Sequence, residues 1–225
     1  MKILIVSATI FEIQPLINFL QENYSENPDG SYKVGDQSIT ILVTGVGIMQ
    51  TTFELTKTTS GQSFDFAINL GVCGSFDRTN TLGDVVEIIT DRMGDLGAED
   101  ADGTFMDAFD MNLDQKDKYP YQNGWISKLE SHFTKTNLTL KKGITVNKVT
   151  GSNESIFDIQ KKYQADVESM EGAAFFFVCA KMNIPSIQVR AISNYVEARN
   201  KANWKMEEAI HNLKIFALSY LNIKL

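Results

Sequence analysis

Short apolar runs alternate along the chain with segments whose apolar residues recur every three or four positions. Residues 2–7, KILIVS, form a continuous apolar run, as expected for a strand that is covered on both faces. The following segment has apolar residues at helical spacing from Ile13 to Leu20, and Pro15 falls in its expected first turn, where a missing N–H costs little. The pattern predicts a buried strand followed by an amphipathic helix.

The alternation continues to the end of the chain. Further strands are predicted at 38–44, 64–70, 85–90, 143–150 and 184–192, and further helices at 48–60, 125–133, 154–163, 172–182 and 203–221. Strands that alternate with helices favour an α/β layered fold with a mainly parallel or mixed sheet. The segment 91–121 differs, because it is polar and rich in Asp and Gly, and a connection of that length is usually functional or mobile.

Length and composition limit the classes of function. A chain of 225 residues with 43% hydrophobic content fits one large domain, 1–225. A net charge of -7 and a pI near 4.9 argue against nucleic acid or an anionic membrane surface as the main partner. The first apolar run is short and lacks the features of a signal peptide, and no later run reaches membrane-spanning length. We therefore expect a cytoplasmic protein.

Metal, disulfide and dinucleotide chemistry all lack the residues they need. Cys73 and Cys179 lie far apart in apolar surroundings and are expected to be buried thiols. No HExxH spacing occurs, and neither histidine has a nucleophile nearby in sequence. The glycine turn at 45–47 fails the dinucleotide pattern because Gln50 stands where a small residue is required. No metal and no cofactor are expected.

The segment 166–199 has the features of the floor of a site. Glu171 precedes Gly172 at the predicted start of a helix, where free backbone N–H groups and the helix dipole favour an ionised carboxylate. The next predicted strand ends in Ser193 and Asn194, and ligands of open α/β sheets bind beyond the carboxyl ends of the strands. These polar residues are therefore expected to face a ligand.

Each candidate also has an ordinary structural explanation. Glu12, in a first helical turn, is by composition alone more often a solvated partner of the helix dipole than a catalyst. Glu168 is most simply explained by an ion pair. Arg190 lies in an apolar strand, where a cation needs either a partner carboxylate or a ligand, and Met170 is most simply a core residue.

Six motifs occur in an order and spacing that together resemble one family. They are KILIVSATIFEI, VTGVG, INLGVCGS, the LGD turn at 82–84, VESMEGAA and VRAISN, and they extend over nearly the whole chain. Together they resemble the nucleoside phosphorylase and nucleosidase superfamily. Within it, the chain is most similar to the methylthioadenosine/S-adenosylhomocysteine nucleosidases and, closer still, to the futalosine hydrolases, which share the patterns at 94–100, 167–175 and 192–200. The resemblance implies a three-layer fold with a central mixed, twisted sheet flanked by helices.

The resemblance also implies roles for single residues. Glu12 activates the attacking water, Glu171 holds the ribose 2′- and 3′-hydroxyls, Met170 packs under the sugar, Cys73 and Gly74 lie near the base, and Arg190 helps to place Glu12 and the water. These roles agree with the chemistry, because cleavage of an N-glycosidic bond builds positive charge on the sugar and carboxylates beside the ring stabilise that charge. The implied substrate is a small purine nucleoside.

Asn194 departs from the pattern of the adenine-specific nucleosidases, which have an aspartate in the matching position. An asparagine amide delivers no proton to the base, but its NH₂ group can hydrogen-bond N7 or the O6 of a 6-oxopurine. The implied reaction is the release of hypoxanthine from futalosine, a step of menaquinone biosynthesis. The alternatives are that the pocket binds adenine after all, as in a methylthioadenosine-type nucleosidase, or that another residue protonates the base.

Three further expectations remain open at this stage. Phosphate needs arginine or lysine clamps, and the glycine turns have no arginine close in sequence, so water is the expected acceptor. If the substrate is futalosine, Arg199 or Lys201 is expected to meet its carboxylate. Members of this type resemble homodimers in which a partner loop closes the site, a role assigned here to part of 94–110. A non-catalytic nucleotide-binding module is the third, least favoured hypothesis.

Overall fold

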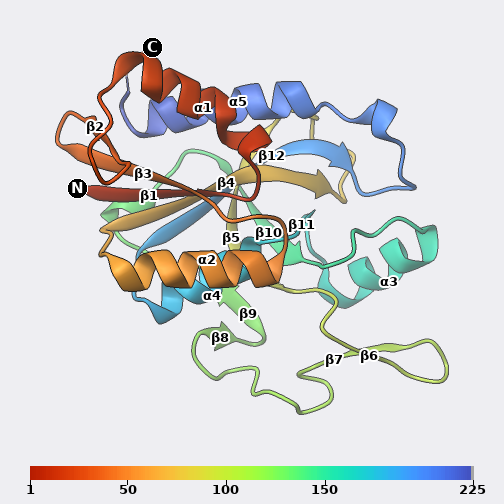
Figure 1. Ribbon diagram of the computed structural model, residues 1–225. Coiled ribbons are helices and arrows are strands. Elements are labelled where there is room, and N and C mark those ends of the chain that lie inside the picture. The colour runs from red at the N-terminus through yellow and green to blue at the C-terminus, as the bar shows by residue number, and fades with distance from the viewer. Residues whose placement is uncertain (224–225) are drawn as a thin grey trace.

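A computed structural model describes residues 1–223 and has a mixed ten-stranded sheet between helices, as predicted (Figure 1). In spatial order the strands are β2 (Tyr32–Val34), β3 (Gln37–Val43), β1 (Lys2–Ser7), β4 (Phe66–Ser75), β11 (Val167–Ser169), β10 (Thr139–Thr145), β5 (Val85–Met93), β9 (Trp125–Ser127) and β8 (Tyr121–Gln122). The tenth strand, β12 (Ser186–Tyr195), pairs with both β4 and β5. The last two positions of the predicted domain, 224 and 225, lie outside the described residues.

Helices cover both faces of this sheet. The helices are α1 (Ile10–Asn23), α2 (Ile48–Gly61), α3 (Asn153–Tyr163), α4 (Gly172–Lys181) and α5 (Met206–Tyr220), with single 3₁₀ turns at His132–Thr134 and Lys201–Asn203. Figure 1 shows α1 and α5 above the sheet and α2 and α4 below it. Alternate residues of β1 serve the two sides, because Ile3 and Ile5 pack in the core under α1 and α5, whereas Leu4 and Val6 pack in the core over α2 and α4. This two-sided burial explains the continuous apolar run at the N-terminus.

Five strands close into a ring. β12 joins β4 in parallel and β5 antiparallel, while β11 and β10 connect β4 to β5 on the other side. A β-bulge between Ile192 and Asn194 shifts the register of β12 against β4. Bulges bend a strand and re-aim its side chains, and this one lies at the carboxyl end of β12, where Asn194 was expected to face a ligand.

Several element predictions differ from the structure. The predicted helix 125–133 is wrong, because Trp125–Ser127 is strand β9, paired with β5 through Asp91↔Ile126 and Thr90↔Ser127. The strand predicted at 143–150 lies at Thr139–Thr145 instead. β4 does not end before the glycines at 71–74 but continues through them to Ser75, because β11 and β12 pair with this part of the strand. Pro15 lies in the second turn of α1, not the first.

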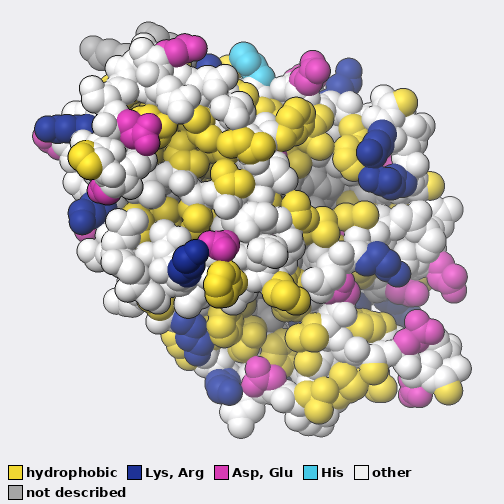
Figure 2. Space-filling model, in the orientation of Figure 1, with side chains coloured by type: hydrophobic (Ala, Val, Ile, Leu, Met, Phe, Trp, Pro, Cys, Tyr) yellow, Lys and Arg dark blue, Asp and Glu magenta, His cyan; other side chains and the backbone are white. Residues whose placement is uncertain are grey.

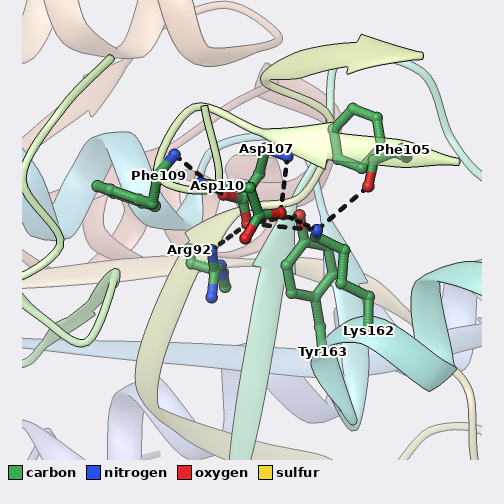
Figure 3. Close-up of polar contacts among 7 residues, drawn as sticks. All are labelled: Arg92, Phe105, Asp107, Phe109, Asp110, Lys162 and Tyr163. Carbon is green, nitrogen blue, oxygen red and sulfur yellow. Dashed lines mark hydrogen bonds and ion pairs between the residues drawn. The ribbon is translucent and has the colours of Figure 1, made fainter. Parts of the chain in front are cut away.

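The polar segment 91–121 contains a small second sheet. Its strands, β6 (Gly97–Glu99) and β7 (Phe105–Asp107), form a hairpin that lies beside α3 in Figure 1. Figure 3 shows the contacts that hold the hairpin in place. Asp107 forms a 2.7 Å ion pair with Arg92 of β5. Lys162 of α3 forms an ion pair with Asp110 and donates a hydrogen bond to the Phe105 carbonyl at 3.2 Å. These contacts hold the hairpin against β5 and α3 of the same chain.

Candidate functional site

Glu12 is held at the start of α1 by both of its carboxylate oxygens. Thr9 caps the helix and donates its N–H at 3.0 Å and its hydroxyl at 2.7 Å to Oε2. The Val72 N–H of β4 donates to Oε1 at 3.0 Å. This capping box fixes the carboxylate against the sheet. Glu12 is half-buried, as a group that meets a ligand should be.

Arg190 reaches the same place from β12. Its side chain is 0% exposed, and a methyl group at Gly71 would overlap Nη1 and come within 3.1 Å of Glu12 Oε1. A glycine at position 71 is therefore what lets the guanidinium and the carboxylate meet on one side of β4. The partners of Arg190 are neutral, since Nε donates to Gln188 Oε1 at 3.0 Å and Nη2 donates to Asn69.

Arg190 has one donor left over. Among the described residues, Nη1 has no hydrogen-bond partner, and no carboxylate lies within ion-pairing distance of this guanidinium. The structural ion pair considered from the sequence is therefore absent from residues 1–223. A buried cationic donor that shares one side of Gly71 with Glu12 is suited to orient a polar ligand or a water there.

Glu171 supplies the second carboxylate. It is the N-cap of α4, is 6% exposed, and its Oε1 accepts a 2.9 Å hydrogen bond from the Gly47 N–H at the start of α2. Burial raises the pKa of Glu171, Arg190 and the Gly47 N–H oppose that rise, and Glu12 adds to it. Both charged groups thus influence the ionisation of Glu171. Met170, directly before it, is half-buried.

Gly74 and Asn194, which were expected to lie near the base, line a cavity of about 220 Å³ at the end of β12. Asn194 lies opposite Gly74, and its Nδ2 is 3.1 Å from where a methyl group on Gly74 would stand. Asn194 Nδ2 donates to the Tyr195 carbonyl at 2.9 Å, and Oδ1 accepts from the Ser193 hydroxyl at 2.8 Å. One amide N–H therefore remains for a ligand.

The two groups are joined by one stretch of β4. Val72 binds Glu12, Gly74 lies against Asn194, and Cys73 stands between them. Cys73 is 3% exposed and packs in the core over α2 and α4, and burial raises the pKa of its thiol to about 12, so it is a neutral core residue and no nucleophile. Val72 and Gly74 are two residues apart, so the carboxylate of Glu12 and the cavity of Asn194 border the same short stretch of β4.

The two cations expected to meet a carboxylate lie at the rim. Arg199 lines the 220 Å³ cavity, is exposed, and stacks its guanidinium 5.9 Å from the centre of the Trp204 ring. Lys201 faces a different depression, beside Trp204 and α5. Arg199 is thus the one of the pair that shares a cavity with Asn194.

A buried polar network supports Arg190 from inside the strand ring. Gln188 receives the Arg190 Nε hydrogen bond and donates to Asp91 Oδ2 at 3.1 Å. Asp91 also accepts from the Thr145 hydroxyl at 2.9 Å, and that hydroxyl accepts from the Ala173 N–H at 2.7 Å. The chain of contacts links Arg190 to the first turn of α4, which Glu171 caps.

Sequence reasoning missed several of these residues. Thr9 had a readable signal, because Thr9 and Glu12 have the spacing of a capping box. Gln188 and Arg190 are two apart on a strand and so share a face, which is also visible in the sequence. Asp91 and Gly47 had no local signal, since their contacts depend on strands and helices that meet only in the folded chain. The ion pair expected for Glu168 does not occur among the described residues, where Thr150 is its partner.

Within residues 1–223, no helix is both long and apolar enough to cross a membrane. The same residues contain no group of three or more His, Cys, Asp or Glu side chains placed to hold a metal ion.

The site brings together two carboxylates, one buried cation and one amide. Such an arrangement is suited to stabilising positive charge while a water is activated.

Known proteins resemble this chain in sequence and in fold. A futalosine hydrolase from Thermus thermophilus is 26% identical over 176 residues, which are 76% of this chain and 76% of that protein. A 5′-methylthioadenosine/S-adenosylhomocysteine nucleosidase from Staphylococcus aureus is 30% identical over 166 residues, 71% of this chain and 69% of that protein. The crystal structure of futalosine hydrolase from Helicobacter pylori has the same fold, with a TM-score of 0.79 at 20% identity over 98% of this chain and 97% of that one.

These relatives confirm the resemblance that the motifs indicated. They are named as a hydrolase and a nucleosidase, which supports nucleosidase activity in this chain as well. The family model described as the phosphorylase superfamily matches residues 2–222. The chain belongs to the phosphorylase superfamily.

Proposed function

We propose that this protein hydrolyses the N-glycosidic bond of futalosine and releases hypoxanthine, as a step of menaquinone biosynthesis. The observation that carries the proposal is the continuity of β4, which joins the Glu12–Arg190–Glu171 cluster to the cavity of Asn194. The sugar lies at the carboxylates and the base lies in the cavity. In this proposal residues 1–225 form one cytoplasmic nucleosidase domain that needs no metal and no cofactor.

Each residue of the cluster has a place in the reaction. Glu12 accepts the proton of the attacking water as the water oxygen adds to C1′ and the bond from C1′ to the base breaks. The base leaves with the bonding electrons and takes up a proton from solvent, because the Asn194 amide supplies none. Arg190 Nη1 donates to that water and holds it beside Glu12. Glu171 accepts hydrogen bonds from the 2′- and 3′-hydroxyls, and Met170 packs under the ring. A positioned general base contributes roughly 10²–10⁴ in rate.

Water is the proposed acceptor because a phosphate beside Glu12 needs arginine clamps, and three of the four arginines make their contacts with other residues. Arg78 pairs with Glu197, Arg92 pairs with Asp107, and Arg199 stacks on Trp204. Arg190 is the one arginine of the four that lies at Glu12. The Gly47 N–H, at a turn that otherwise suits an anion, donates to the Glu171 carboxylate.

The second candidate is a methylthioadenosine/S-adenosylhomocysteine nucleosidase, which releases adenine. The 30% identity to the Staphylococcus aureus relative favours it. Asn194 favours the first candidate, because its free amide N–H donates to O6 of hypoxanthine, whereas the 6-amino group of adenine is itself a donor. A related 6-amino substrate, 6-aminodeoxyfutalosine, belongs with the second candidate.

The decisive experiment is a base-release assay on the purified protein. Futalosine, inosine, methylthioadenosine and S-adenosylhomocysteine are each incubated with and without phosphate, and the free base is identified by chromatography. We expect hypoxanthine from futalosine at a rate independent of phosphate. Adenine release would support the second candidate, phosphate-dependent turnover would refute the choice of water, and no release from any substrate would leave the binding-module hypothesis.

The carboxylate of futalosine is assigned to Arg199, and the experiment has a matched pair of substrates. Replacement of Arg199 by Ala should raise KM for futalosine, which carries the carboxylate, by about tenfold or more, as for loss of a charge-assisted hydrogen bond. KM for inosine, which lacks the carboxylate, should stay within about twofold. The same increase for both substrates would refute this assignment. Lys201→Ala is the control, since Lys201 lies outside the cavity.

A further inference from the structure

Glu168 is a buried carboxylate that neither the predicted roles nor the mechanism uses. It lies in the middle of β11, is 5% exposed, and lines the 220 Å³ cavity together with Asn194. Among residues 1–223 it has no cationic partner within ion-pairing distance. Buried acids are rare unless they are paired, because an unpaired buried charge is unfavourable. A carboxylate that lines a cavity is therefore suited to accept a hydrogen bond from a ligand in that cavity.

Thr150 uses only part of the hydrogen-bond acceptor capacity of the Glu168 carboxylate. The Thr150 N–H donates to Oε1 at 2.9 Å, and the Thr150 hydroxyl donates to Oε2. An ionised carboxylate has about four lone-pair sites, so each oxygen keeps capacity for another donor. Burial raises the pKa of Glu168, and the two Thr150 donors oppose that rise because they bind the ionised form.

Purine bases differ at N1 and at the neighbouring group on C6, where such an acceptor can form a hydrogen bond. In hypoxanthine and other 6-oxopurines, N1 carries a hydrogen and the neighbouring O6 is an acceptor. In adenine, N1 has no hydrogen and the neighbouring amino group is a donor. A cavity wall with one fixed acceptor and one fixed donor therefore matches the first edge and mismatches the second.

We propose that Glu168 accepts the N1–H of a 6-oxopurine while Asn194 donates its amide N–H to O6, so that the two side chains together select the base. The inference rests on the proposed function, because it places the base in the Asn194 cavity. It adds a second residue to the specificity that the sequence assigned to Asn194 alone. In this proposal Glu168 contacts the substrate directly.

The test replaces Glu168 by Gln and measures kcat/KM for inosine and for methylthioadenosine. The variant keeps the size of the side chain, but its NH₂ group faces N1 as a donor. We expect kcat/KM for inosine to fall by about 10- to 100-fold, as for the loss of a hydrogen bond to a charged group. Methylthioadenosine should lose nothing or gain, since a donor suits N1 of adenine. A ratio of the two values that changes less than threefold would refute the proposal.

Thr150→Val is the matched control for a purely structural role. It removes the hydroxyl that holds Glu168 and leaves the carboxylate in place. If Glu168 only anchors the Thr150 loop, Glu168→Gln and Thr150→Val should reduce turnover of both substrates alike, and that outcome contradicts the inference. The unmodified protein separates the two levels of the argument: no base release from any substrate refutes the proposed function, whereas release with an unchanged ratio in Glu168→Gln refutes only the role of Glu168.

A binding measurement on the unmodified protein keeps the inference testable if Glu168→Gln fails to fold. Hypoxanthine and 1-methylhypoxanthine differ by the N1 hydrogen that Glu168 is proposed to accept. Titration calorimetry should give a Kd at least tenfold weaker for the methylated base. The comparison base 9-methylhypoxanthine, which keeps N1–H and carries its methyl group where the sugar joins, should bind within about threefold of hypoxanthine. Equal binding of hypoxanthine and 1-methylhypoxanthine would overturn the assignment.

Discussion

In the proposed reaction, Glu12 serves both the fold and the chemistry with the same carboxylate. One oxygen completes the capping box of α1 and the other accepts the Val72 N–H. A capping box accepts Gln as well as Glu at this position, so a conservative replacement separates the two roles. Structural loss and catalytic loss can therefore be measured independently at one residue.

Glu12→Gln should abolish most of the activity while leaving the fold intact. The amide oxygen still accepts from the helix cap, but the amide cannot take a proton from water, so kcat should fall by about 10²–10⁴. The melting temperature should stay within a few degrees of that of the unmodified protein. Thr9→Ala is the opposite control, since it should cost about 1 kcal/mol of stability with a smaller loss of rate. Retained turnover in Glu12→Gln would exclude Glu12 as the base.

The residues that the sequence identified are those whose surroundings are local. Glu12 lies in the first turn of α1, and Glu171 lies at a helix start next to Gly172, so a few neighbouring residues determine the surroundings of each. Arg190 was only half understood. Its burial in an apolar strand was visible, but its neutral partners Asn69 and Gln188 depend partly on a strand more than a hundred residues away. Contacts of that kind leave no periodic trace in the sequence.

At the scale of elements, the ring of five strands encloses a polar centre. A methyl group at Gly143 would come within 2.8 Å of Asp91 Oδ2, and one at Gly172 would overlap Asp91 and Gln188. The two glycines make room for the network that joins β5, β10, β12 and the first turn of α4. The same elements carry Arg190 and Glu171, so the network fixes the site by fixing the strands.

Asp91 gives this network a measurable pH dependence. Asp91 is fully buried, and burial raises its pKa to about 6 from 3.8. Because the folded state holds the proton more tightly, Asp91 favours folding below pH about 4, and this contribution is lost as the pH rises through about 6. A shift of this size corresponds to about 3 kcal/mol. At pH 4 Asp91 is already partly ionised in the unfolded chain, so relative to Asp91→Asn the unmodified protein should lose about 2 kcal/mol of unfolding free energy between pH 4 and pH 7.

Urea unfolding of the two proteins at pH 4, 5, 6 and 7 checks this prediction. Other titrating groups are common to both chains, so the difference between the two curves isolates Asp91. Curves that stay parallel over the whole range would show that Asp91 does not titrate there.

Element predictions failed where pairing with distant strands decides the structure. Residues 125–133 have a pattern compatible with a helix, but Trp125–Ser127 forms a strand that pairs with β5. The glycines at 71–74 suggested the end of a strand, yet Glu168↔Gly74 and Ile192↔Cys73 pair across them. The elements with a strong internal period, such as α1 and β1, were predicted well, because their burial follows from their own sequence.

At the scale of the whole molecule, the face of α2 leaves large apolar side chains exposed. Met49 is 82% exposed, Phe53 62% and Val46 52%, and Phe11 at the start of α1 is 59% exposed. Figure 2 shows apolar side chains over α2 at the lower middle of this face. Exposed apolar patches of this kind mark interaction sites. The patch begins beside Gly47, which binds Glu171, so whatever covers it also borders the site.

A second copy of this chain is the proposed occupant, and the introduction of charge into the patch tests it. Met49→Lys together with Phe53→Lys should convert a dimer to a monomer, since two lysines per subunit would face their symmetry mates in an apolar interface. Light scattering after gel filtration measures the mass, and the release assay shows whether an isolated subunit keeps its turnover. Phe157→Lys is the control, because Phe157 is 66% exposed but lies on α3, away from this patch. If the unmodified chain is already a monomer, the site is complete in one subunit, and the partner role proposed for residues 94–110 is wrong. If only the double variant is a monomer and its kcat/KM falls at least tenfold, the neighbouring subunit contributes to the site.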